Sequence, residues 1–156
     1  MNADSDYSPA KIYKTLRTQA LKITAAQVGA NDGAYGILKE TGYPETVVSL
    51  LALSDGTASF YFSNGGGIIG AGKKERPAVA ARSLVAFAAH NLAHLEPALD
   101  TPLPRPGHIR FYVLTSEGVV TADAREQDLG ENRHVLSPFY HAAQELITEI
   151  RTSDEA

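Results

Sequence analysis

The segment from Phe60 to His90 holds the densest glycine cluster of the chain, followed by two adjacent lysines. A glycine-rich turn exposes backbone N–H groups, and a nearby lysine adds positive charge, so such a segment can hold an anion. The candidate ligand-binding residues are therefore Asn64, Gly65, Gly66, Gly67, Lys73 and Lys74.

The same segment contains the letters of two nucleotide-binding motifs, G-x-G-x-x-G over 65–70 and G-x-x-x-x-G-K over 67–73. The first motif requires a helix that opens at its last glycine, but the helical pattern begins only near Pro77. The second requires Ser or Thr after its lysine, and Lys74 stands there. A turn and a short further strand, with another backbone passing close by, are the favoured interpretation.

Two histidines suggest a metal site. His90 and His94 stand four residues apart in a predicted helix, as zinc ligands do in H-E-x-x-H, but no glutamate stands between them. A third ligand would have to come from His108, His134 or Glu96. A metal-dependent enzyme centred on His90 and His94 is thus kept as an alternative, while no cofactor is expected.

A hydrolytic triad has the residue types but no motif. Ser63, Asp128 and His134 could supply serine, aspartate and histidine, yet the chain lacks a G-x-S-x-G turn. The polar segment 125–136 is predicted to be a solvated connection with internal ion pairs.

The elements that would position these residues follow the order α–βββ–α–ββ–α. A first helix is predicted from Ser8–Pro9 to Gly29 and a last one from Ser137–Pro138 to Ile150, since Ser-Pro pairs are typical of helix starts. A helix between them is predicted from about Pro77 to Leu95. Residues 34–63 read as a three-stranded meander with a type I′ turn at Asp55–Gly56, and 108–123 as a hairpin turning at Glu117–Gly118. The prediction is an α+β fold, an antiparallel sheet of about five strands packed with three helices.

Length and composition indicate one globular domain. The chain has 156 residues, no cysteine and a net charge of −4. We expect a disordered segment 1–7, a domain over 8–152 and a loose end over 153–156. The charge argues against nucleic-acid binding, and neither a signal peptide nor a membrane span is predicted, so we expect a cytoplasmic protein that does not bind membranes.

Four stretches carry a resemblance: ETGYPE (40–45), FSNGGGIIGAG (62–72), RFYVLT (110–115) and LSPFYHAAQELIT (136–148). They resemble a family of small uncharacterised bacterial proteins, which implies no activity. The element order is also similar to that of profilin-like or roadblock-like domains. That likeness would imply dimers or partner binding through a sheet edge or helix face, and no catalysis.

A patterned core without a coherent catalytic constellation favours a non-enzymatic interaction or scaffold domain. Such a domain would form a homo-oligomer or bind a protein partner. The first alternative is a small-molecule or anion-binding protein that uses segment 64–74, and the second is the metal enzyme at His90 and His94.

Overall fold

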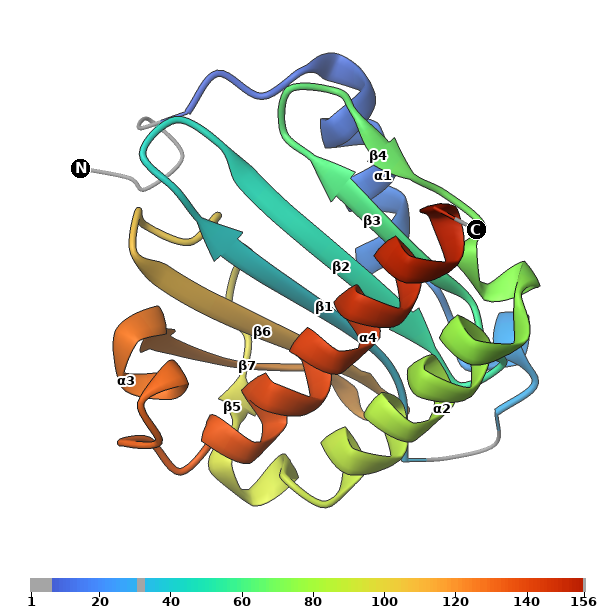
Figure 1. Cartoon of the computed structure of the whole chain (residues 1–156). Coiled ribbons are helices and arrows are strands. Elements are labelled where there is room, and N and C mark those ends of the chain that lie inside the picture. The colour runs from blue at the N-terminus through green and yellow to red at the C-terminus, as the bar shows by residue number, and fades with distance from the viewer. Residues whose placement is uncertain (1–6, 31–32, 156) are drawn as a thin grey trace.

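The chain forms one seven-stranded antiparallel sheet with helices on both faces (Figure 1). The computed structural model describes residues 7–30 and 33–155. Its strands are β1 (Ala34–Gly42), β2 (Val47–Leu53), β3 (Ala58–Phe62), β4 (Gly67–Ile68), β5 (Glu96–Pro97), β6 (His108–Thr115) and β7 (Gly118–Arg125). The strand order is β4-β3-β2-β1-β6-β7-β5, so β1 lies at the centre.

In residues 7–30 and 33–155, four α-helices and three short 3-10 helices accompany the sheet. They are α1 (Lys11–Leu21), α2 (Glu75–Ala89), α3 (Glu126–Gly130), α4 (Ser137–Glu155), η2 (Ala26–Val28), η3 (Ala71–Lys73) and η4 (Leu92–His94). Among the described residues, none of these helices has the length and apolar character that crossing a bilayer requires.

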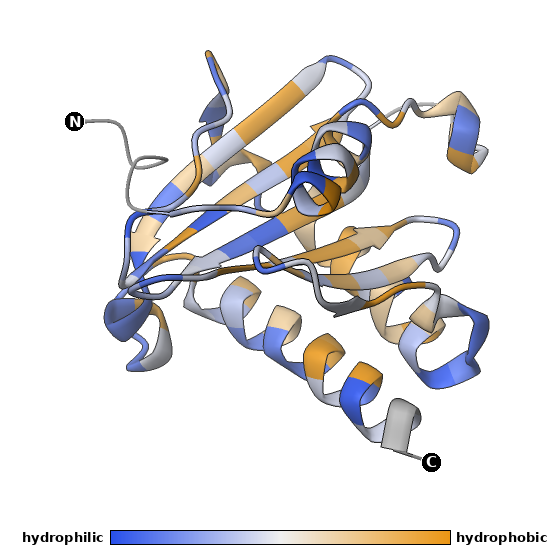
Figure 2. Ribbon diagram, turned by 90° about the horizontal axis from the view of Figure 1, so that it is seen from above, coloured by the Kyte–Doolittle hydropathy of each residue, from blue (hydrophilic) through white to orange (hydrophobic). Residues whose placement is uncertain are grey.

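The sheet separates two hydrophobic cores. On one face, α2 and α4 lie side by side and pack on strand residues such as Ile37 and Leu50. On the other face, α1 packs through Tyr13 and Ala20 against the side that carries Leu38. Figure 2 looks down on these layers, with α4 running along one side of the sheet. Because β1 is covered on both faces, every residue of it after Ala34 is buried.

The α+β class and the antiparallel sheet are confirmed, but the sheet has seven strands instead of about five. The two additional strands, β4 and β5, are two residues long and lie at the two edges. The short strand β4 is the one that the glycine-rich segment predicts, and it pairs with β3. The pairing of β5 with β7 is visible only in three dimensions, since β5 lies in a proline-rich connection. The fourth helix, α3, lies inside the segment expected to be a loop.

Several predicted boundaries are wrong. Ser8 does not cap the first helix, which starts at Lys11 with Ala10 as its N-cap and ends at Leu21. The turn after β2 is not type I′, because that turn needs two residues of positive φ and only Gly56 has one.

The expected ends of the domain differ as well. Residues 1–6 of the segment predicted to be disordered lie outside the described residues, while Tyr7 is buried. At the other end α4 remains helical as far as Glu155, where we expected a loose segment.

Candidate functional site

The predicted glycine turn is closed by its own hydrogen bonds. Asn64 and the two glycines after it connect β3 to β4, and the Asn64 side chain accepts a bond of 3.0 Å from the Gly66 N–H. The Gly65 N–H donates to the Phe62 carbonyl at 2.9 Å. Gly67 pairs with Tyr61 in the sheet, which confirms the predicted short strand. The Gly65 and Gly66 amides are therefore engaged within the turn.

The two candidate lysines lie at the other end of β3. Gly72, just before Lys73, lies against the turn that precedes β3, where a Cβ would fall 2.1 Å from the Gly56 carbonyl oxygen. This contact confirms the predicted close backbone approach. The Lys74 ammonium group donates a hydrogen bond to the Ser153 carbonyl in α4, and Lys73 is exposed. The structure does not bring the glycine turn and the lysines together, and ligand binding by this segment stays a prediction.

The histidine pair does not share a helix face. Helix α2 ends at Ala89, so His90 only caps it, while His94 lies in η4, and both are exposed. His108 instead bonds Asp123 at 2.7 Å. No group of three or more histidine or acidic side chains suited to a metal is found in residues 7–30 and 33–155.

The other sequence candidates make local bonds. The Ser63 hydroxyl accepts from the Val47 N–H at 2.9 Å, and His134 accepts from the Leu136 N–H at 3.0 Å. Arg133 forms ion pairs with both Asp128 and Glu131, which confirms the internal pairing predicted for segment 125–136. Ser63, His134 and Arg133 thus form hydrogen bonds or ion pairs within the fold.

A row of polar side chains crosses the α1 face of the sheet, and the sequence reasoning missed it. Ser49 on β2, Glu40 on β1, Arg110 on β6 and Asp123 on β7 stand opposite one another in the strand register. Directly paired residues point to the same face, so the four side chains form one line.

Glu40 and Arg17 form the centre of this row. The Glu40 side chain is 0% exposed and takes two bonds of 2.8 Å from Arg17, one at each carboxylate oxygen. The Ser49 hydroxyl donates to the same carboxylate at 2.7 Å, and Tyr13 bonds Ser49 at 2.7 Å. Burial and then the nearby Glu40 charge raise the pKa of Tyr13 above its usual range, so its hydroxyl keeps its proton.

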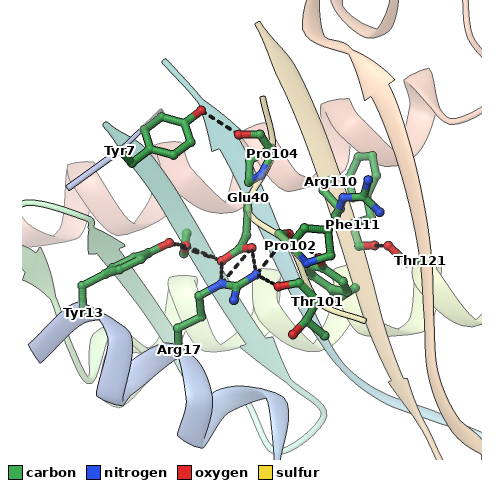
Figure 3. Close-up of polar contacts among 12 residues, drawn as sticks. Tyr7, Tyr13, Arg17, Glu40, Thr101, Pro102, Pro104, Arg110, Phe111 and Thr121 are labelled. Carbon is green, nitrogen blue, oxygen red and sulfur yellow. Dashed lines mark hydrogen bonds and ion pairs between the residues drawn. The ribbon is translucent and has the colours of Figure 1, made fainter. Parts of the chain in front are cut away.

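The same cluster fastens residues 101–104 over the sheet (Figure 3). Arg17 donates to the Thr101 carbonyl at 2.8 Å and Tyr112 to the Pro102 carbonyl at 2.5 Å. Tyr7 donates to the Pro104 carbonyl at 2.6 Å. The charge of Glu40 is thus compensated within the fold, and the polar row has a structural role.

On the opposite face of β1, Lys39 is buried next to α4. The residue is 2% exposed, and its ammonium group donates to Gln144 at 2.5 Å and lies 5.1 Å from the centre of the Tyr140 ring. Burial lowers the pKa of Lys39 to about 8, against a smaller opposing effect of Glu126. No ion pair within 4 Å joins Lys39 to a described carboxylate.

Lys39 lines a cavity of about 400 Å³ between the sheet and one flank of α4. The sheet side of the cavity is mostly apolar, and the α4 side carries Gln144, Ile147 and Arg151. An apolar cavity with a few converging polar groups is typical of small-molecule sites.

A second, larger hollow of about 590 Å³ lies between α2 and α4. Its apolar lining includes Val79, Leu84 and Phe87 on α2, while Glu145 and Glu149 line it on α4. Arg76 bridges the two helices through an ion pair of 2.9 Å with Glu149. This α2–α4 groove uses the other flank of α4 from the Lys39 cavity.

The missed residues were hidden by the apolar strand that carries them. Lys39 and Glu40 interrupt the run Ala34–Thr41 with adjacent charges, which in a strand must point to opposite faces. Had β1 been expected at the centre of a sheet covered on both faces, this pair would have indicated two buried charges.

No family model, no curated protein and no solved structure matches this chain.

Proposed function

We propose that this chain is a non-enzymatic protein-interaction domain whose α2–α4 groove binds an amphipathic helix carrying basic side chains. The observation that supports it is an open apolar groove with an acidic border. Grooves between two helices receive partner helices through their apolar faces, with residues at every third or fourth position as anchors.

The shape of the groove suits a helix. Val79, Ser83 and Phe87 stand at successive turns of α2, and Val79 is 48% exposed despite being apolar. Ala80 and Ala142 also line the groove, and such small side chains allow another helix to approach closely. Val79 is thus an exposed apolar side chain that a partner's apolar residue could cover.

The charges around the groove favour a basic partner over a second copy. Glu75, Glu145 and Glu149 line it, and the Arg76 charge is already paired with Glu149. Two copies that met groove to groove would bring these carboxylates together in a chain of net charge −4. Complementary charge on a partner increases association rate and specificity.

The experiment compares two synthetic helical peptides of about 18 residues, or five turns, with identical leucine positions. One carries lysine and the other glutamate on its polar face, and binding is followed by fluorescence anisotropy. We expect the Leu/Lys peptide to bind and the Leu/Glu peptide to bind at least about tenfold more weakly. The variant Val79→Glu, which places a carboxylate on the apolar anchor, should abolish binding.

The matched control is Leu99→Glu, which adds the same charge at a side chain that is 98% exposed outside the groove. This variant should bind the Leu/Lys peptide as the wild type does. Equal binding of both peptides, or equal loss in both variants, would refute the groove as the docking site. Dimer formation that Val79→Glu abolishes, without peptide binding, would assign the groove to a second copy instead.

A further inference from the structure

We propose a second binding site in the Lys39 cavity, which takes a small monocarboxylate: the carboxylate pairs with the Lys39 ammonium and the apolar part lies against the walls formed by β2, β3 and β4. This site is independent of the proposed function, because the two hollows lie along different flanks of α4. The groove uses Ala142, Glu145 and Glu149, whereas the cavity uses Gln144, Ile147 and Arg151.

The first argument is the unbalanced charge of Lys39. An ammonium group has three N–H donors, and in the part of the chain that the structure describes the Lys39 ammonium group donates a hydrogen bond to Gln144 alone. A buried cation is unfavourable unless an anion compensates it, and among the described residues no carboxylate lies within ion-pair distance. A ligand carboxylate would supply both the missing charge and the missing acceptor.

The second argument is the charge of the groups that face Lys39. From α3, Glu126 acts on Lys39 at longer range, while its carboxylate accepts a bond of 3.2 Å from Tyr140. From α4, Arg151 lines the cavity as a second cation and is exposed. Tyr43, after β1, lines it too, and its raised pKa keeps it neutral. The cavity lining therefore carries two cations and no carboxylate.

The third argument is the shape of the cavity. Phe60 is buried, while Val48, Phe62, Ile68 and Ile147 are half-buried and pack at the border of the core. The Phe60 and Phe62 rings meet edge to face at 5.0 Å, which gives a firm aromatic wall. A volume of about 400 Å³ falls within the range of known small-molecule pockets.

These features together select the ligand class. Apolar walls favour an alkyl or aryl body. Of the two cations only Lys39 is buried, and its one charge matches one negative charge, while the exposed Arg151 is compensated by solvent. A polyanion such as a nucleotide would leave charges against Val48 and Phe62 without compensation. Octanoate is thus a suitable probe, and 1-octanol is its neutral counterpart with the same chain length.

The experiment titrates the wild type and Lys39→Met with octanoate and with 1-octanol, using calorimetry and NMR chemical shifts. Methionine keeps the apolar stem of the lysine and removes its charge. The control Lys14→Met removes one charge from an exposed position on α1, across the sheet. We expect octanoate to bind the wild type and Lys14→Met alike, and Lys39→Met at least about tenfold more weakly. The affinity for 1-octanol should not change among the three proteins.

A second variant serves if Lys39→Met does not fold. Ile147→Trp keeps Lys39 and fills the cavity from α4, so it should also abolish octanoate binding. The proposal is wrong if binding of octanoate to the wild type does not reach saturation, or if octanoate binds Lys39→Met equally well. It is also wrong if the NMR chemical shifts that octanoate changes belong to residues outside the cavity. Binding of the Leu/Lys peptide should be unchanged in Lys39→Met, so failure here is distinguishable from failure of the proposed function.

Discussion

Lys39 and Glu40 are neighbours in the chain and are both buried, yet on opposite faces of β1 one charge is paired with an opposite charge and the other is not. Glu40 lies under α1 with Arg17, Ser49 and Tyr13 arranged around its carboxylate. Lys39 lies under α4 with an amide and an aromatic ring, and with no described carboxylate within ion-pair distance. One charge is thus compensated by the fold, and the other is available for a ligand.

The difference separates a structural charge from a functional one. A buried ion pair whose charges are hydrogen-bonded holds elements in place, as Arg17 does for α1 and residues 101–104. A buried cation without an anion is a net cost to folding, which the rest of the core must offset. Perturbed groups of this kind lining a cavity are typical of binding sites.

The largest expected effect comes from removing the cation that compensates Glu40. Arg17→Met leaves the Glu40 carboxylate buried with hydroxyl partners alone, which should lower the free energy of unfolding by about 3–5 kcal/mol. Lys39→Met replaces an uncompensated charge by an apolar side chain and should change it by less than about 1.5 kcal/mol. Urea unfolding of both variants measures the contrast.

The control for this contrast is Arg17→Met combined with Glu40→Gln, which removes both charges and keeps an acceptor for Ser49. The double variant should be more stable than Arg17→Met alone. Equal losses in Arg17→Met and Lys39→Met would contradict the distinction between the two faces.

The second expected effect is the pH dependence that Lys39 imposes. Its pKa is about 8 in the folded chain and near the ordinary 10.5 when unfolded, so between these values the unfolded state holds more protons. Stability should therefore rise with pH across this window, by at most about 1.4 kcal/mol per pH unit, and the rise should be absent in Lys39→Met.

The tyrosines with a raised pKa have the opposite effect on how stability depends on pH. Unfolded tyrosine loses its proton above pH 10, before Tyr13 or Tyr112 does in the folded chain, so stability falls there in both proteins. The difference between wild type and Lys39→Met below pH 10, measured by urea unfolding at each pH, isolates the lysine. A flat difference would mean that Lys39 is not perturbed.

The smallest expected effect concerns the fastening of residues 101–104. Tyr112→Phe removes the hydroxyl that donates to the Pro102 carbonyl and should lower stability by about 1 kcal/mol. Hydrogen exchange should show faster exchange of the amides near Thr101, with little change at α4. A change at α4 as large as that near Thr101 would mean that the two faces are not independent.

Much of the fold could be predicted from local patterns. Apolar and β-branched runs bounded by turn signals predicted β1, β2, β3, β6 and β7. The glycines after Phe62 indicated a turn and a short strand, which β4 confirms. The Ser8–Pro9 pair predicted the wrong helix start, because the Ala10 N–H donates a hydrogen bond to the carbonyl of Ser63, in the turn after β3. That tertiary contact has no local signal.

The sites could not be predicted in the same way. The polar row depends on the register of four strands, and the role of Lys39 depends on which helix covers its face. Residues Lys39 and Gln144, far apart in the chain, meet only after the sheet and α4 have packed. The glycine-rich segment was a candidate site in the sequence because its signal, a run of glycines followed by two lysines, lies within one short stretch of the chain.

The most direct test of the distinction between the two faces is the pKa of Lys39 itself, followed by NMR of its side chain with and without octanoate. In the free protein we expect a value of about 8, caused by burial without an anion. Octanoate should raise this pKa, because a carboxylate beside the ammonium group favours its protonated form. A normal pKa near 10.5 in the free protein, or a lowered pKa that octanoate leaves unchanged, would contradict the account.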